Sequence, residues 1–324
     1  MLAMIARIFR AGLVLTISAF ACAASAQSFP ARPVRIVVPF PPGGSVDFVA
    51  RVVAKKLTDA WGQTVLVENR PGGNSSIGSQ FVSRSAPDGH TLLVNASIFI
   101  YSPHLSKAPY DPLVDFTPIA LIARGGLIMS VAPNLPVKDI KDFIAYAREN
   151  PEKINFAVGS IGSAGHLAQE LLRTQAGVTW TTVPYKGSAP AYTDLMGGNV
   201  QAFTDPAAGS MPHAKAGKIR GIAVTSTQRM KSMPDLPTVA EQGYPGFQFY
   251  SWWGLYGPPN MPRELAARIN DAVNRVTQGR DVIELLDAQA VEPIQWTPEQ
   301  FAKFQNEDSA LARQIIRNSN IKVD

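Results

Sequence analysis

Apolar positions in the first part of the chain follow two different spacings in turn, which is typical of alternating strands and helices. Residues 34–39 form a β-branched run that ends in a turn rich in Pro and Gly. The next apolar residues recur at helical spacing, with charged residues on the opposite face: Val46, Val49, Ala50, Val53, Ala54 and Leu57. The pattern predicts a strand, a tight turn and a helix in direct succession.

The same succession repeats along most of the chain. Further strands are predicted at residues 64–67, 91–95, 127–132, 154–158, 179–184, 200–204 and 219–225. Further helices are predicted at residues 75–84, 137–149, 166–175, 262–277 and 298–318, so the C-terminal part is expected to be mainly helical. Alternating strands and helices predict an α/β fold in which helices cover both faces of a parallel sheet.

Two such α/β halves occur without a low-complexity linker, which predicts two lobes joined by crossing strands. The crossings are expected near residues 120–127 and 219–228. Lobe 1 would comprise residues 27–125 and 226–324, and lobe 2 residues 126–225. Because ligands of open α/β sheets bind at the carboxyl ends of strands, we expect a ligand cleft between the lobes.

The first 26 residues have the layout of a secretory signal peptide. Arg7 and Arg10 precede an apolar run that closes on Ala-Ser-Ala, and cleavage is expected after Ala26. The run is short for a bilayer crossing, and no later stretch of about 18 apolar residues follows. A lipoprotein interpretation of Cys22 needs a bulky aliphatic residue where Ala19 stands. We expect an exported, soluble mature protein.

The composition narrows the classes of function that we expect for this chain. Cys22 is the only cysteine, so the mature chain would have no disulfide and no thiolate metal site. The leader holds two of the 30 basic residues and none of the 25 acidic ones, which leaves a net charge of +3. Without a cluster of basic residues, this mild excess suits a small anionic ligand better than nucleic acid.

Three loops share one chemical character: residues 41–45, 159–165 and 184–188. Each is small and Gly- or Ser-rich, and each leaves a predicted strand and enters a predicted helix. Such a loop exposes backbone N–H groups at the positive end of a helix, where a carboxylate or phosphate binds well. The alternative is that Gly and Ser serve only as turn and cap residues. None of the loops contains Arg, so affinity would depend on backbone donors.

Single residues near these loops each allow two interpretations. Phe40 and Tyr185 either wall a cleft from opposite lobes or fill the core at strand ends. Asp205 either accepts a ligand ammonium or hydroxyl or caps the next turn. His166 either donates to an anion or is structural. Asp47 fits a structural role in the first turn of its helix.

Aromatic residues gather late in the chain, at Tyr250, Trp252, Trp253 and Tyr256. They line the cleft or fill the core, and the core interpretation is favoured. No Ser lies in Gly-x-Ser-x-Gly, no Gly-x-Gly-x-x-Gly occurs, and the four histidines lack metal-ligand spacing. We therefore expect no metal, no cofactor and no enzyme activity.

Several sequence blocks occur in a fixed order: PVRIVVPFPPGG at 33–44, ENRPGG at 68–73, GHL at 165–167, VPYKG at 183–187, AKAGK at 214–218, PTVAE at 237–241 and WWGL at 252–255. In these blocks the chain resembles the substrate-binding receptors of tripartite tricarboxylate transporters, also called Bug-type periplasmic receptors. The resemblance spans nearly the whole mature chain. It implies a type II-like periplasmic-binding-protein fold, with two α/β lobes that close on a ligand.

The resemblance also implies a site. One side would comprise Phe40, Gly43, Gly44 and Ser45, and the other side Ser160, Ser163, Ala164, His166 and Tyr185. Secondary candidates are Asn95, Ser97 and Asp205. The ligand would be a small organic acid, aromatic acid or amino acid, whose carboxylate is held mainly by backbone groups and ordered water.

The implied function is a periplasmic receptor, expected to be a monomer, that delivers its ligand to membrane subunits of a tripartite tricarboxylate-type transporter. Two alternatives stay open. One is a sensor subunit that presents bound ligand to a membrane signalling protein. The other is a serine hydrolase that uses Ser45, Ser160 or Ser163.

Overall fold

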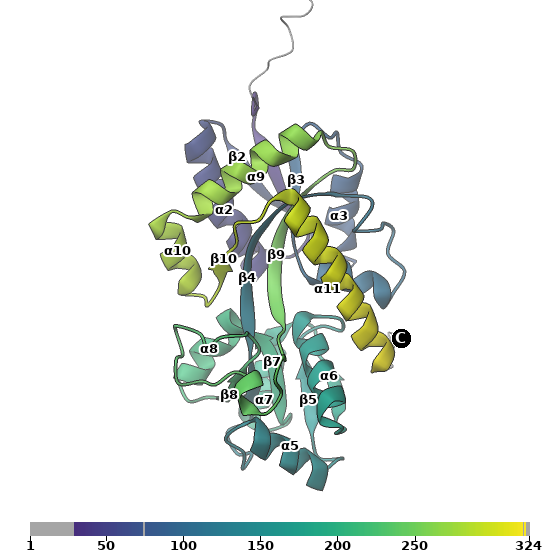
Figure 1. Ribbon diagram of the computed structural model, residues 1–324, viewed down its shortest axis with the longest axis vertical. Helices are drawn as coiled ribbons and strands as arrows, with labels where there is room; N and C mark the ends of the chain where they lie inside the picture. The colour runs from purple at the N-terminus through teal and green to yellow at the C-terminus, as the bar shows by residue number, and fades with distance from the viewer. Residues whose placement is uncertain (1–28, 74, 320, 322–324) are drawn as a thin grey trace, which may run out of the picture.

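The computed structural model describes residues 29–73, 75–319 and 321. The predicted signal peptide, residues 1–26, therefore lies outside the described residues. Two lobes are stacked along the long axis, and two strands, β4 (Thr117–Val131) and β9 (Tyr250–Gly257), run from one lobe into the other (Figure 1).

The upper lobe consists of one mixed sheet covered by helices. Its strands are β1 (Val34–Val38), β2 (Val65–Asn69), β3 (Thr91–Ala96), β10 (Glu292–Pro293) and parts of β4 and β9. Its helices are α2 (Ser45–Trp61), α3 (Ser76–Ser83), α4 (Ile98–Tyr101), η2 (Ser102–His104), α9 (Arg263–Thr277), α10 (Arg280–Asp287) and α11 (Pro298–Asn318). Strand β1 pairs in parallel with β2 and β3, whereas β9 is antiparallel to both β3 and β4.

The lower lobe has the same plan. Its strands are the end of β4, β5 (Asn155–Val158), β6 (Thr181–Pro184), β7 (Ala202–Pro206) and β8 (Arg220–Val224). Its helices are α5 (Ile140–Glu149), α6 (Ala164–Ala176), α7 (Ser188–Gly197), α8 (Ala207–Lys215) and η3 (Ala240–Gln242). Strand β5 is parallel to β6 and β7, and the end of β4 pairs antiparallel with β7 and β8.

Helix α2 shows how the sequence specifies these elements. Its predicted apolar face is buried, from Val46 at 6% exposed to Leu57 at 0%. The helix ends at Gly62, whose φ of 62° is left-handed and whose N–H donates to the Thr58 carbonyl. Each fully buried aliphatic side chain stabilises the fold by about 1.5–3 kcal/mol.

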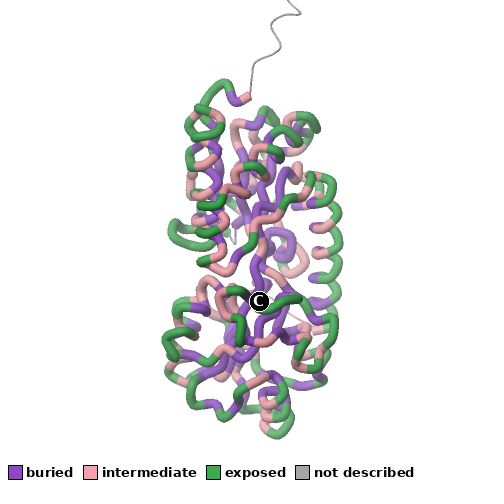
Figure 2. The backbone as a smooth tube through the Cα atoms, turned by 60° about the vertical axis from the view of Figure 1, so that its left-hand side comes forward, coloured by how far each residue is buried: buried purple, intermediate pink, exposed green. Residues whose placement is uncertain are grey.

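Hydrophobic clusters fill both lobes and also join them. One cluster lies under α2 and α9 in the upper lobe, and a second fills the lower lobe around Phe143 and Phe156. A third, which we call the bridging cluster, packs Leu167 and Ala168 of α6 against Phe301 and Ile315 of α11. Figure 2 shows buried backbone running through the middle of both lobes.

The predicted α/β class is confirmed, but the sheet is mixed and not parallel. Because the chain enters the lower lobe by β4 and returns by β9, these neighbouring strands run in opposite directions. Strand β9 was not among the predicted elements. Its residues Trp252 and Trp253 face opposite sides of the sheet and are both buried, so the segment shows no polar alternation.

We propose that the chain returns from the lower lobe at β9, a different position from the crossing expected near residues 219–228. Strand β8 pairs with β4 inside the lower lobe, and Val239 and Phe247 pack in the lower cluster. The Phe249 N–H donates to the Thr225 carbonyl. From this packing we propose that residues 226–249 belong to the lower lobe, which corresponds to the expected lobe 2.

Candidate functional site

The first predicted loop lines a cavity of about 290 Å³ at the junction of the two lobes. Its walls are formed by Gly43, Gly44, Ser45, Phe48, Val49, Ala208, Trp253, Gln289 and Val291. Ala208 belongs to α8 of the lower lobe, and the other residues belong to upper-lobe elements or to β9. No charged side chain is among them, so an occupant would meet neutral donors and apolar walls.

The loop is held by a buried carboxylate. One oxygen of Asp47 accepts hydrogen bonds from the Gly43 N–H at 3.0 Å and from Arg51 Nε at 2.8 Å. The other accepts from Asn69 Nδ2 at 2.9 Å, and that amide also donates to the Phe40 carbonyl. The bond from Arg51 is the main cause that lowers the pKa of Asp47 to about 2. Asp47 is thus ionised and structural, as its sequence position indicates.

The same loop leaves a helix end open toward the cavity. Gly44 is the N-cap of α2, and no side chain caps this end. The N–H groups of Ser45 and Val46 consequently lack helical partners and contribute to the positive end of the helix dipole. Gly43 has a φ of +87°, a conformation that favours glycine. A Cβ on Gly44 would find open space, its nearest atom being the Pro41 carbonyl oxygen at 4.0 Å.

The second loop is arranged differently, because its polar groups bond to one another. Ser163 Oγ accepts from the backbone N–H of His166 and caps α6. His166 Nδ1 accepts from the Gly162 N–H at 3.0 Å, which puts the ring proton on Nε2. Burial lowers the pKa of His166 to about 4, so the ring is neutral at pH 7. A Cβ on Gly162 would lie 2.4 Å from Leu105 of the upper lobe.

Asp205 lies at the end of β7, between the starts of α7 and α8. It accepts from Ser188 Oγ at 3.0 Å and from the Tyr192 hydroxyl at 2.9 Å. Burial raises the pKa of Asp205 to about 7 even though both hydroxyls favour the ionised form. The Gly187 N–H, just before α7, donates to the Gly159 carbonyl and ties the second loop to the third.

The aromatic residues at the strand ends pack against the cores. Phe40 contacts the upper cluster, and Tyr185 contacts the lower one. The Tyr185 hydroxyl donates to Asp194 at 2.6 Å, toward the far end of α7. Burial, with help from Asp194, raises the pKa of Tyr185 to about 12. These contacts favour the core interpretation of both residues over paired walls.

The secondary candidates Asn95 and Ser97, at the end of β3, form hydrogen bonds within the protein. Asn95 is fully buried, donates to Ser79 Oγ and accepts from the Ala96 N–H. The Ser97 N–H donates to the Trp252 carbonyl. Of the twelve predicted site residues, the cavity brings together Gly43, Gly44 and Ser45. Ligand contact by Ser160, Ala164 and the other members stays a prediction.

Several cavity residues were not predicted. Ala208, Gln289 and Val291 lie far from the first loop in the sequence, and no local pattern marks them. Trp253 was recognised only as part of the aromatic cluster, of which Trp252, Trp253 and Tyr256 are at most 1% exposed. The core interpretation is confirmed for Trp252 and Tyr256, whereas Trp253 is buried and also lines the cavity.

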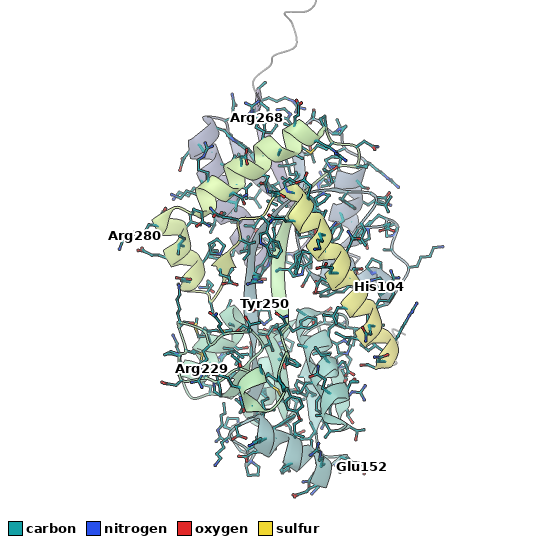
Figure 3. All side chains as sticks on the ribbon, in the orientation of Figure 1. His104, Glu152, Arg229, Tyr250, Arg268 and Arg280 are labelled. Carbon is teal, nitrogen blue, oxygen red and sulfur yellow. The ribbon has the colours of Figure 1, made fainter. Side chains whose placement is uncertain are left out.

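A second cavity, of about 280 Å³, is lined by Tyr250 and Arg229 among other residues. Figure 3 labels Tyr250 where the two lobes meet and Arg229 on the lower lobe. It contains charged residues, but each has a partner of opposite charge. Arg124 Nε lies 2.6 Å from Glu292, Arg229 bonds both oxygens of Glu241, and Lys231 lies 3.9 Å from Asp287. No predicted site residue lines this cavity, so we assign the site to the first one.

Within residues 29–73, 75–319 and 321, no group of three or more His, Cys, Asp or Glu side chains is placed to hold a metal ion. Over the same ranges, none of the helices combines the length and apolar character that a membrane crossing needs.

The family model described as "Tripartite tricarboxylate transporter family receptor" matches residues 49–321. Protein BugT of Bordetella pertussis is 34% identical over 315 residues, which cover 96% of this chain and 97% of BugT.

Two solved structures that are similar to this chain are described with a ligand. "R. palustris Rpa4515 with adipate" has a TM-score of 0.82 and 34% identity, covering 91% of this chain and 99% of that one. MatC from Rhodopseudomonas palustris with bound malate has a TM-score of 0.78 and 31% identity, covering 89% of this chain and all of MatC. These likenesses confirm the periplasmic-binding-protein fold.

Proposed function

The chain belongs to the tripartite tricarboxylate transporter receptor family, and from that premise we propose that it is a periplasmic receptor for a small carboxylate. It captures the ligand between its two lobes and delivers it to membrane subunits of a tripartite tricarboxylate-type transporter. The observation that carries the proposal is the cavity at the lobe junction, where the uncapped start of α2 offers backbone N–H groups to an anion.

Neutral hydrogen-bond donors are suited to binding a carboxylate. A carboxylate that accepts several N–H bonds in a cavity without other charges is stabilised by short, charge-assisted hydrogen bonds. Because Gly44 lies on the upper lobe and Ala208 on the lower one, an occupant touches both lobes. It therefore favours the closed state to the extent that it binds that state more tightly.

Relatives with solved structures support the ligand class. Adipate and malate, named in two of them, are both dicarboxylates. The hydrolase alternative gains no support from the site. In the described residues, no hydrogen bond joins Ser45, Ser160 or Ser163 to an imidazole ring, and Ser163 Oγ serves as a helix cap.

The test is a thermal-shift panel on mature protein that has been unfolded and refolded to strip carried-over ligand. The panel contains mono-, di- and tricarboxylates, aromatic acids and amino acids. A ligand at 100 times its Kd adds about 2.7 kcal/mol to the free energy of unfolding, which raises Tm by several degrees. A panel without any shift would contradict the proposal.

Gly44→Val locates the site within this experiment. We expect the variant to lose the ligand-induced shift while its own Tm stays within about 2 °C of wild type, because a side chain at residue 44 meets open space. Ala60→Val, near the exposed far end of the same helix, is the matched control and should bind normally. Normal binding by Gly44→Val would move the site away from this cavity.

Pull-down from membranes with and without ligand separates transport from sensing. Ligand-dependent capture of transporter subunits supports the proposal, whereas capture of a signalling protein supports the sensor alternative.

A further inference from the structure

Gln289 lines the cavity at the lobe junction with a polar side chain that the protein itself leaves unused. The residue is half-buried, and both polar atoms of its amide stay accessible. Within the described residues, this amide takes part in no hydrogen bond. The other polar side-chain groups of the described walls are the Ser45 hydroxyl and the Trp253 Nε1, and the Trp253 Nε1 is buried. Gln289 therefore offers the cavity an amide that no group of the described chain satisfies.

The turn that ends α10 holds the backbone of Gln289 in place. The Ala290 N–H donates to the Asp287 carbonyl, and the Val291 N–H donates to the Leu286 carbonyl. These two bonds form a Schellman motif, in which Ala290 is the left-handed residue with a φ of 53°. Leu286 and Val291 lie in the same upper cluster, as the apolar residues of this motif usually do. The backbone of Gln289 is thus fixed, whereas its side chain has no partner.

Helix α10 is in turn fixed against α2. Lys56 Nζ of α2 lies 2.5 Å from the Asp281 carboxylate of α10. Val282 and Leu286 of α10 are each 1% exposed in the upper cluster under α2. Figure 1 shows α10 below α2 and above α8, the helix that provides the lower-lobe wall of the cavity. The uncapped start of α2 and Gln289 therefore belong to one rigid part of the upper lobe.

Resting on the function proposed above, we infer that Gln289 is a specificity-determining residue. Its amide NH₂ donates to a second carboxylate of the ligand, remote from the carboxylate at the start of α2. A carboxamide carries two N–H donors and one acceptor oxygen, and it loses its bonds to water when an apolar ligand tail covers it. Sites built to hydrogen-bond a polar group reject analogues that lack this group. The cavity therefore prefers a dicarboxylate to a monocarboxylate of the same length.

The test uses pairs of acids in which a methyl group replaces one carboxylate. The pairs are adipate with hexanoate, succinate with butyrate, and terephthalate with p-toluate. The variant is Gln289→Leu, which keeps a side chain of similar size without polar atoms. Gln278→Leu is the matched control, because Gln278 is also half-buried, follows the neighbouring helix α9 and lines neither cavity.

Titration calorimetry on the refolded proteins measures the preference within each pair. Wild type should bind the diacid of at least one pair about tenfold or more tightly than its monoacid, since a hydrogen bond to a charged group is lost in the monoacid. Gln289→Leu should weaken binding of that diacid about tenfold and bind the monoacid within about twofold of wild type. Gln278→Leu should bind both acids like wild type.

Three results would overturn the inference and leave the receptor function standing. They are equal binding of diacids and monoacids by wild type, an unchanged preference in Gln289→Leu, and an equal loss of both acids in Gln289→Leu, which would mean a structural role. Wild type that binds none of the six acids would also overturn it. If the whole carboxylate panel were flat as well, the proposed function would fall with it.

A second measurement does not depend on the affinity of a variant. In wild-type protein with 15N-labelled glutamine, the side-chain NH₂ resonance that is missing in Gln289→Leu belongs to Gln289. This resonance should move on addition of the bound diacid, because the amide gains a charged acceptor. The Gln278 resonance should stay in place. An unmoved Gln289 resonance at saturating diacid would contradict the inference.

Discussion

Charged residues beside the cavity hold the protein's own loops and are not aimed at a ligand. Asp47 was predicted as structural because a carboxylate in the first turn of a helix interacts favourably with the helix dipole. Its third partner, Asn69, comes from β2, and no local pattern reveals it. Likewise, the sequence predicted that a helix starts at His166, but it did not predict that the His166 ring accepts a hydrogen bond from the Gly162 N–H. Residue types and their loops could be predicted, whereas the direction of each polar side chain depends on distant packing.

Asp205 gives a pH dependence with a definite sign. Its pKa is raised from about 3.8 to about 7 in the folded protein, so between pH 4 and 7 the folded state holds a proton that the unfolded state lacks. Its contribution to the free energy of unfolding is largest below pH 4 and is lost as the pH rises through 7, by about 1.4 kcal/mol per pH unit at most. Asp205→Asn should remove this component.

Urea denaturation of both proteins from pH 4 to 8 measures the difference. Asp194→Asn is the control, because hydrogen bonds lower the pKa of that exposed carboxyl and its contribution has the opposite sign. Parallel stability curves for wild type and Asp205→Asn would show that Asp205 is ionised across this range.

At the scale of elements, the helix starts near the cavity differ in how they are capped. Ser163 caps α6, whereas α2 and α7 begin at Gly44 and Gly187 without a side-chain cap. The sequence predicted residue ranges for the strands and helices around the first two loops, whereas it gave no range for the helix that follows the third loop, α7. It did not distinguish the capped end from the open ones, because Ser in such a loop serves either purpose.

Gly165 fixes how closely α6 approaches β7. A Cβ on this residue would lie 2.0 Å from the Thr204 carbonyl oxygen, which is rigid backbone. We expect Gly165→Ala to lower the free energy of unfolding by about 1–3 kcal/mol, as overpacking does. Gly197→Ala, at the end of α7, has its nearest atom at 3.6 Å and should be neutral or stabilising by up to about 1 kcal/mol. Chemical denaturation of the two variants tests the contrast, which equal stabilities would refute.

At the scale of the whole molecule, α11 connects the lobes on the side opposite α10 (Figure 1). It packs in the bridging cluster with α6, Arg173 of α6 donates to the Ser319 carbonyl at 3.4 Å, and Asp308 accepts from Tyr101 and Trp252. The sequence predicted α11 almost residue for residue but not its partner helix, because contacts between segments this far apart leave no local pattern.

The bridging cluster should make both lobes unfold together. Ile315 is 4% exposed in this cluster, and Ile315→Ala should lower the free energy of unfolding by about 2–5 kcal/mol. Calorimetry should show one transition in wild type and one, several degrees lower, in the variant. Leu311→Ala, on the same helix but 36% exposed, should have a much smaller effect. Two separate transitions in wild type would show that the lobes are not coupled.

The open end of α2 bears on how a receptor of this shape diversifies. The anion donors that we propose are main-chain N–H groups held in place by Gly43, Gly44 and the Asp47 carboxylate, so substitution of a neighbouring wall side chain leaves them unchanged. The walls at Phe48 and Ala208 are formed by side chains, so a substitution there changes the shape of the cavity directly. Receptors that keep this helix start would therefore keep the proposed binding of an acid group. Substitutions in the cavity walls would change which acid fits.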